Sequence, residues 1–229
     1  MISYPVPPTW CIVIPSYNAG KHLDRLIKLI MRQYSFEPAQ LVIVNDGSDD
    51  GSCSNLPIRK LTLLTHPVNE GKGRAMMSGW RYAQSRNYRY VLFMDADGQH
   101  PADSIRDFIG KSAGLDTDLI IGCREIDRHM PWTRKTSNLI GSLLVSLLLG
   151  HRILDTQSGF RLIRIATLVK FSYFSRRYEL ETEILFKFIR SGCRLDYVKI
   201  PTIYHAQSSH YRLLPDLMRF LRTLIRLSL

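Results

Sequence analysis

The sequence has 229 residues, of which 45% are hydrophobic, and this is enough for one domain with a sizeable core. Its 31 Lys and Arg against 20 Asp and Glu give a formal net charge of +11. Such an excess favours an anionic partner, either nucleic acid, a phosphorylated small molecule or an acidic membrane surface. The four cysteines lie far apart, which excludes the paired spacing of a zinc site and is typical of free thiols in a reducing compartment.

The N-terminal stretch MISYPVPPTW has neither a basic start nor an apolar run, so we do not expect a signal peptide. The longest apolar run, at residues 139–149, has about eleven residues, which is too short to span a bilayer and predicts a buried helix. We therefore expect a cytoplasmic protein that is soluble or bound to a membrane surface.

Strand-like and helix-like segments alternate along the chain. Short apolar runs predict strands at residues 11–14, 41–44, 61–64, 90–94, 119–121 and 195–200. Helical patterns predict helices at residues 22–33, 74–86 and 101–111. This alternation, with wholly apolar strands, favours a single α/β domain in which helices cover both faces of a mostly parallel sheet.

Polar clusters follow three of the predicted strands. PSYN follows the first strand, NDGSDDGS the second and DADGQH the fourth. Ligands of parallel sheets bind beyond the carboxyl ends of the strands, so we expect the three clusters to line one crevice.

The cluster DADGQH carries two carboxylates and an amide at alternate positions. Asp95 and Asp97 are two residues apart, so both point to the same side of an extended chain. Two such carboxylates repel each other unless a cation lies between them, and hard oxygen ligands suit Mg²⁺ or Mn²⁺. Gln99 would add a third oxygen. The alternative is an acidic turn or helix cap, but the position after an apolar strand in a basic chain favours a metal–diphosphate site.

The motifs together resemble those of family-two glycosyltransferases of the GT-A fold, and in particular the branch of dolichyl- and polyprenyl-phosphate sugar transferases. The resemblance extends from about residue 11 to about residue 212 and rests on PSYN, VNDGSDDGS, NEGKGRA, MDADGQHP, GCR, DTQSGFR and RYELETEIL, in that order. It implies a Rossmann-like GT-A domain. It also implies a metal-dependent transferase that moves a sugar, with inversion, from a UDP- or GDP-linked donor to a lipid-linked acceptor such as a polyprenyl phosphate.

The resemblance implies a role for each matching residue. Asp46 is expected to accept a hydrogen bond from the base, and the metal ligands are expected to be Asp95, Asp97 and Gln99. The expected contacts of the nucleotide sugar are Pro15, Tyr17, Asn18, Asp46, Lys72, Asp95 and Ala96. Those of the phosphate or acceptor are Arg124, Arg134, Ser137, Gln157 and Ser158. The chain departs from the family at Ala19, where members often carry an acid, and at Asn45-Asp46, where two acids are common.

The segment NEGKGRA contains glycines but matches neither the Walker A pattern nor GxGxxG. We interpret it as a loop at the mouth of the crevice. Lys72 then either contacts the diphosphate or is a solvated surface lysine, and the same two alternatives hold for Arg134 on its basic segment.

The candidate catalytic residues are Asp97, Asp155 and Glu181. A phosphate acceptor is already anionic, whereas a hydroxyl acceptor needs a carboxylate to accept its proton. Asp155 or a glutamate of ELETE would be that base. On a helix Glu179 and Glu183 share one face and Glu181 lies on another, and we expect at least one of the three to be a plain surface charge.

The C-terminal residues 213–229 predict a separate helix after a domain of residues 1–212. Pro215 and Asp216 suit its start, and Arg219, Arg222 and Arg226 form a basic stripe on an otherwise apolar segment. Such a helix either lies in a membrane interface or packs on its own domain or on a partner. With a lipid-linked acceptor, the first alternative predicts peripheral contact with the inner face of the membrane.

Three other functions would account for part of the sequence. Transfer to a hydroxyl of a glycolipid or glycan keeps the fold and changes the acceptor. Nucleotidyl transfer usually needs a glycine-rich, arginine-bearing loop after the first strand, and PSYNAGKH does not provide one. A nucleic-acid-binding module would cluster its basic and aromatic residues on one face. Here the basic residues are scattered and the Asp pair would be unexplained, so we expect no nucleic-acid partner. The sequence leaves the oligomeric state open.

Overall fold

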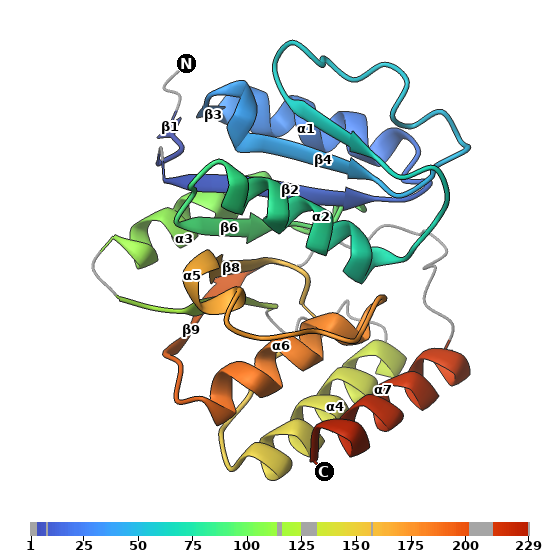
Figure 1. The fold of residues 1–229 in the computed structure, drawn as a ribbon, viewed down its shortest axis with the longest axis vertical. Helices are drawn as coiled ribbons and strands as arrows, with labels where there is room; N and C mark the ends of the chain where they lie inside the picture. The colour runs from blue at the N-terminus through green and yellow to red at the C-terminus, as the bar shows by residue number, and fades with distance from the viewer. Residues whose placement is uncertain are drawn as a thin grey trace.

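The computed structural model describes residues 4–7, 9–113, 116–124, 132–156, 158–201 and 213–228. Within helices α4 and α7 it describes side chains only from residues 141 and 218 onward. A central sheet runs through the molecule, and helices lie on both of its faces (Figure 1).

The central sheet has seven strands in the order β5-β4-β2-β6-β8-β7-β9. The strands are β2 (Trp10–Ser16), β4 (Leu41–Asn45), β5 (Thr62–Thr65), β6 (Tyr90–Phe93), β7 (Leu119–Arg124), β8 (Arg161–Arg164) and β9 (Leu195–Ile200). Every pairing is parallel except those of β8, which is antiparallel to β6 and β7. The predicted mostly parallel α/β sheet is therefore confirmed. A second, small sheet pairs β1 (Tyr4–Pro5) with β3 (Tyr34–Ser35).

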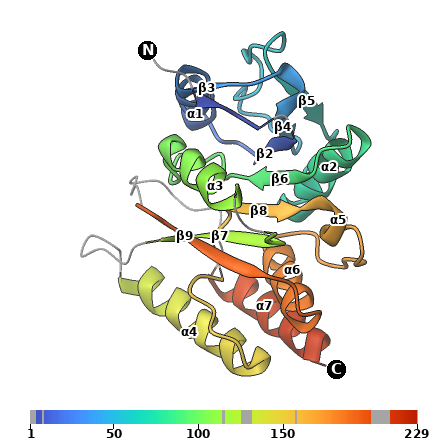
Figure 2. The same ribbon diagram turned by 90° about the vertical axis from the view of Figure 1, so that its left-hand side faces the viewer.

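The helices are α1 (Lys21–Gln33), α2 (Lys72–Ser85), α3 (Ile105–Ser112), α4 (Trp132–Leu149), α5 (Ile165–Leu168), α6 (Glu179–Arg190) and α7 (Leu213–Ser228). Short 3₁₀ turns occupy η1 (Pro38–Gln40) and η2 (Ala102–Ser104). Figure 2 shows α3 on one side of the sheet and α2 and α5 on the other.

Strand β2 explains why the central strands are apolar throughout. Its residues alternate between two cores: Ile12 and Ile14 pack in the core that contains α1, and Cys11 and Val13 in the core that contains α2. Successive side chains of a strand point to opposite faces, so a strand covered on both faces must be apolar at every position.

The apolar run at residues 139–149 forms the C-terminal part of α4, and the prediction of a buried helix is wrong for half of it. Gly141, Ser142 and Val145 are buried, because this face of α4 packs towards the protein and α4 contacts α6. The opposite face is exposed and carries Leu143, Leu144, Leu147 and Leu148. Within the described residues, no helix combines the length and the hydropathy needed to cross a bilayer.

Helix α7 packs on its own domain, which was one of the two alternatives for the C-terminal segment. Thr223, Leu224 and Leu227 are buried, and α7 lies against α6. Arg190 Nη1 of α6 donates a hydrogen bond to the carbonyl of Leu227 at 2.7 Å. The three arginines of the stripe are on the exposed side of the helix, so α7 packs through one face and exposes the other.

Replacing Tyr34 by Phe should destabilise the fold. The buried Tyr34 hydroxyl donates towards the carbonyls of Ala102 (2.9 Å) and Asp103 (3.1 Å) and accepts the backbone N–H of Arg106 (3.2 Å). Burial raises the pKa of this hydroxyl to about 12. Loss of the hydroxyl leaves these buried groups without their partner, at a cost of about 2 kcal/mol in the free energy of unfolding. Urea unfolding measures this. Tyr4→Phe, at an exposed tyrosine, is the control, and an equal midpoint for the two variants would contradict the expectation.

Candidate active site

The loops after β2 and β4 are joined by hydrogen bonds. The Asn18 side chain donates from Nδ2 to Asp49 Oδ1 at 2.8 Å and accepts the Asp49 N–H at 3.0 Å. The Asn18 N–H donates to Ser48 Oγ at 3.1 Å, and Asn18 takes a φ of 48°, a value that Asn tolerates better than most residues. The first two polar clusters therefore form one wall, as their positions predicted. Of the neighbouring candidates, Pro15 is buried inside β2 and Tyr17 is exposed.

Asp46 follows β4 and anchors the segment that leads into α2. Its buried carboxylate accepts the backbone N–H groups of Gly71 (2.8 Å) and Glu70 (3.0 Å) and lies 2.7 Å from His66 Nδ1. His66 Nε2 in turn lies 2.9 Å from Ser78 Oγ. His66 was not identified from the sequence, which offers no spacing signal for it. A hydrogen bond from Asp46 to a base stays a prediction, and the structure gives this carboxylate a positioning role.

Lys72 lies at the first position of α2 and connects two carboxylates from distant segments. Its Nζ is 2.5 Å from Asp95 Oδ1 and 2.9 Å from Glu181 Oε1, and its side chain is only 16% exposed. Gly73 allows the start of α2 to lie close to the segment before α6. A Cβ at position 73 would lie only 2.7 Å from the carbonyl carbon of Arg176 in that segment. Lys72 is therefore paired with two carboxylates of the candidate site and is not a solvated surface lysine.

Charge in this cluster is balanced by pairing. Burial by itself lowers the pKa of Lys72, but attraction to Asp95 and Glu181 outweighs burial and holds that pKa above its ordinary value. For Asp95, burial raises the pKa, and the charges of Lys72 and His100 outweigh this and hold it well below its usual range. Both groups are thus charged at neutral pH.

The remaining residues of DADGQH surround Asp95. Asp97 Oδ1 accepts the backbone N–H of Gln99 at 2.9 Å, which makes a tight turn. Ala96 is buried, and His100, also buried, places Nε2 3.5 Å from Asp95 Oδ2 with its ring against Phe160.

The chemistry of these donors fits a divalent cation that is shared with a ligand. Over the part of the chain that the structure describes, no cluster of three or more His, Cys, Asp or Glu side chains is arranged to hold a metal ion by itself. Mg²⁺ is usually bound by one or two carboxylates together with substrate phosphates. Asp95 and Asp97 supply such a pair. A side-chain contact of Gln99 with a metal stays a prediction.

A second ion pair lies at the end of β7. Arg124 donates from Nε and Nη2 to the two carboxylate oxygens of Asp155, at 2.8 and 3.0 Å, and Asp155 is 1% exposed. Ser158, three residues further on, is fully buried. The structure therefore brings together three of the residues expected near the acceptor. The side chains of Arg134 and Ser137, and all of Gln157, lie outside the described residues.

Arg161 organises this part of the site, and the sequence reasoning missed it. Its guanidinium is fully buried and donates to the carbonyls of Ser158 (2.7 Å), Thr156 (2.7 Å) and Glu181 (2.6 Å). Burial lowers its pKa. It thereby fixes the DTQSGF segment against the first turn of α6. The available signal was an arginine directly before the apolar pair Leu162–Ile163, where an unpaired charge would be costly.

The expectation that one glutamate of ELETE is a surface charge is wrong, because Glu179, Glu181 and Glu183 are all buried. Glu183 accepts the backbone N–H of Ser175 at 2.9 Å and pairs with Lys187 at 2.5 Å, which is a structural role. Glu181 contacts Lys72 and so lies in the crevice.

The fold, with charged side chains clustered beyond the carboxyl ends of its parallel strands, is that of a glycosyltransferase of the GT-A type. The sequence of residues 11–175 matches glycosyl transferase family 2, and the chain belongs to that family. This confirms the predicted family and enzyme class.

Two curated relatives are informative. The chain is 27% identical over 216 residues to a UDP-N-acetylglucosamine–dolichyl-phosphate N-acetylglucosaminyltransferase of Methanococcus voltae, covering 84% of this chain and 85% of the relative. It is 26% identical over 204 residues to an undecaprenyl-phosphate mannosyltransferase of Micrococcus luteus, covering 84% and 82%. A crystal structure of glucosyl-3-phosphoglycerate synthase from Mycobacterium tuberculosis has a TM-score of 0.75 at 20% identity, covering 97% of this chain and 80% of the other. This similarity shows the fold.

Replacing Gly159 by Ala should impair turnover with little effect on folding. A Cβ on Gly159 would overlap both carboxylate oxygens of Asp95, so the carboxylate must move. A displacement of about 1 Å costs on the order of a hundredfold in rate. The measurement is release of nucleoside diphosphate from a nucleotide sugar. Gly110→Ala is the matched control, because a Cβ there meets no atom within 4 Å. Equal turnover in the two variants would contradict this geometry.

Replacing Lys72 by Met should move the acid limb of the pH–rate profile to higher pH. In the native protein Lys72 depresses the pKa of Asp95, so Asp95 stays ionised until the pH falls well below the ordinary carboxyl value of about 4. Without Lys72, burial acts against the charged form and the pKa rises. Lys111→Met, which removes a lysine from an exposed pair with Asp196, should leave the profile unchanged. An unshifted acid limb in Lys72→Met would show that Asp95 does not govern it.

Proposed function

We propose that the protein transfers a sugar, with inversion, from a nucleoside-diphosphate sugar to a polyprenyl phosphate in a reaction that requires Mg²⁺ or Mn²⁺. The observation that supports a phosphate acceptor is that both candidate bases are engaged in ion pairs. Asp155 is held by both donors of Arg124, and Glu181 is held by Lys72.

A carboxylate that is engaged in charge-assisted hydrogen bonds is poorly placed to accept a proton from a hydroxyl. A phosphate acceptor is already ionised and needs no base. Hydroxyl transfer remains the second candidate, and it would require Asp155 to leave Arg124.

The donor would lie beyond the carboxyl ends of β2, β4 and β6, with its diphosphate over Asp95 and Asp97. A divalent cation bound there supplies Lewis-acid stabilisation of the leaving nucleoside diphosphate. Lys72 orients Asp95 and adds positive charge beside the phosphates. Asp46 holds the segment that carries Lys72 through the N–H groups of Glu70 and Gly71.

The acceptor would lie on the side of Arg124. Its guanidinium presents two parallel donors, which match a phosphate as well as they match the carboxylate of Asp155. We expect the acceptor phosphate to bind the Arg124 guanidinium, either beside the carboxylate of Asp155 or in its place. Ser158 and the backbone of the DTQSGF segment, fixed by Arg161, would form the floor beneath it.

The names of the relatives support this assignment. The Methanococcus voltae relative is named for a UDP-linked donor and dolichyl phosphate, and that of Micrococcus luteus for undecaprenyl phosphate. The Mycobacterium tuberculosis enzyme was crystallised with Mn²⁺ and UDP. A UDP-linked sugar is therefore the first donor to test. A lipid-linked acceptor also implies peripheral contact with the inner face of the membrane, to which residues 213–229 would contribute.

A donor and acceptor screen tests the proposal. The protein is incubated with UDP- and GDP-linked sugars, with Mg²⁺ or Mn²⁺, and with either a short-chain polyprenyl phosphate or a glycan that offers only hydroxyl groups. We expect a sugar–phosphate–lipid product. Product formed on the glycan, with none on the phosphate, would favour the second candidate instead.

Replacing Asp97 by Ala should lower turnover by about a hundredfold or more, the usual cost of removing a strong electrostatic stabiliser. Excess EDTA should have a similar effect on the native protein. Asp107→Ala, at an exposed aspartate of α3, is the control and should retain full activity. Turnover that survives both EDTA and Asp97→Ala would refute the metal-dependent mechanism.

A further inference from the structure

Helix α4 presents an exposed face made of leucine, which we call the leucine face: Leu143, Leu144, Leu147 and Leu148. Leu147 is 71% exposed and Leu143 is 57% exposed, so both side chains are largely in water. Their spacing places all four on one side of the helix, opposite the buried Val145. A soluble protein gains nothing by keeping four adjacent leucines in water, and such a contiguous patch usually marks an interaction surface.

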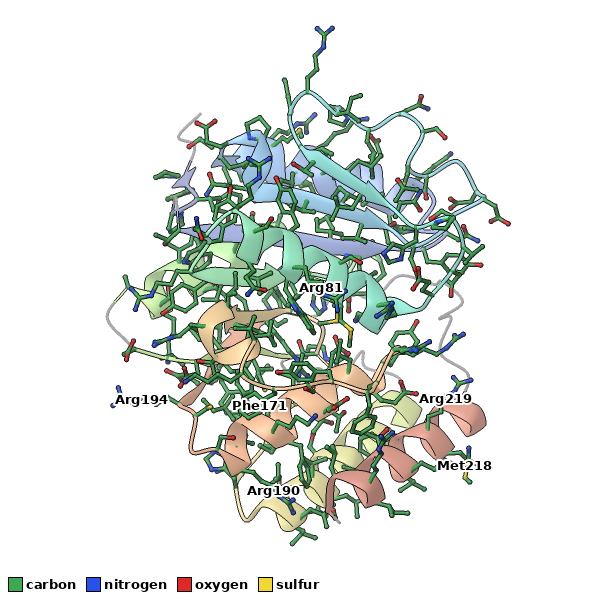
Figure 3. All side chains as sticks on the ribbon, in the orientation of Figure 1. Arg81, Phe171, Arg190, Arg194, Met218 and Arg219 are labelled. Carbon is green, nitrogen blue, oxygen red and sulfur yellow. The ribbon has the colours of Figure 1, made fainter. Side chains whose placement is uncertain are left out.

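Helix α7 adds a second apolar stripe with arginines beside it. Met218, Leu221 and Ile225 are exposed and follow the spacing of one helix face. Figure 3 shows Met218 and Arg219 on α7, with Met218 projecting away from the rest of the protein. Both ribbon views place α4 and α7 at the end of the molecule beyond β9, and α6 packs against each of them (Figures 1 and 2).

The two outer helices carry almost only positive charges. Segment 132–149 contains no Asp or Glu, and segment 213–228 contains only Asp216. A groove between α6 and α7 is lined by Phe171, Phe174 and Phe186 and by Lys187, Arg190 and Arg226. The Arg226 guanidinium lies 3.9 Å from the centre of the Phe174 ring, and that of Arg190 lies 4.5 Å from the centre of the Phe186 ring. These contacts hold both guanidinium groups beside apolar surface.

We propose that the leucine face and α7 together dock the protein on the surface of a bilayer that contains anionic phospholipid. Leucines would enter the acyl boundary, and the arginines of α7 and the groove would meet the lipid phosphates. This inference rests on the proposed function, because it supplies the surface from which a lipid-linked acceptor would reach the crevice.

Charge favours a bilayer over a second copy of the chain. A symmetric dimer through this end would bring the same patch of each copy together. The arginines would then face a surface that offers almost no carboxylate, and like charges across an interface are unfavourable. An anionic lipid surface complements the arginines and accepts the leucines at once.

Vesicle flotation with the full chain tests the proposal. We expect binding to phosphatidylcholine vesicles that contain phosphatidylglycerol, weaker binding without the anionic lipid, and release at high salt. Leu147→Glu should lower the partition coefficient by about tenfold, since it removes one leucine side chain from the apolar contact and adds a negative charge. Ile58→Glu is the matched control, because Ile58 is 67% exposed on a loop outside the α4–α7 end and should bind as the native protein does.

A fluorescence experiment tests the same surface and does not require that the Leu147→Glu variant folds. On addition of anionic vesicles, the emission of Leu147→Trp should shift to the blue by more than that of the native protein, whose three tryptophans set the baseline, and Ile58→Trp should show no such additional shift. Native protein that stays in the soluble fraction at low salt, or Leu147→Glu that floats like the native protein, would overturn the proposal. A native dimer that Leu147→Glu converts to a monomer, with vesicle binding unchanged, would assign the face to a second copy.

The two proposals fail separately. Calorimetric titration with a nucleoside diphosphate and Mn²⁺ reports the crevice alone, and a water-soluble short-chain polyprenyl phosphate reports transfer without a bilayer. Normal results in both, without vesicle binding, would remove only the docking surface. Vesicle binding by a protein that uses no nucleotide sugar would remove the proposed function.

Discussion

The candidate active site depends on one cation, the partly buried ammonium group of Lys72. Lys72 joins Asp95, which follows β6, to Glu181 in the first turn of α6, and Lys72 and Glu181 are 109 residues apart in the sequence. Removing one partner from such an ion pair leaves the other charge uncompensated in a place with little access to water, which is destabilising. The same contacts therefore bring three segments together and hold the pKa of Asp95 well below its usual range.

The acceptor side follows the same principle of local charge balance. Arg124 pairs with Asp155, and Arg161 donates hydrogen bonds to the carbonyls of Thr156 and Ser158, which follow Asp155 in the chain. A diphosphate that enters the crevice brings negative charge to a place where the cations already have partners. A divalent cation is the simplest source of the missing positive charge, which connects the observed pairing to the proposed dependence on Mg²⁺ or Mn²⁺.

Helix α6 relates the crevice to the opposite end of the molecule. Its first turn carries Glu181, while its flanks pack against α4 and α7. Because each of these two outer helices is covered on one side only, their other sides remain in water. One-sided packing thus explains how a run as apolar as residues 139–149 can be half exposed, and why the exposed leucines belong to a surface and not to the core.

The sequence by itself determined the α/β class, most strand positions and the convergence of the three polar clusters, because apolar strands and the polar ends of parallel strands are local patterns. It could not assign β8, since RLIR is short and bounded by arginines, nor the roles of His66 and Arg161, whose partners lie far away in the chain. Only the tertiary structure decided that all three glutamates of ELETE are buried, that Lys72 pairs with Asp95 and Glu181, and that four leucines near the end of α4 face water. Burial is a property of what packs against a residue, and a segment's own sequence does not contain its neighbours.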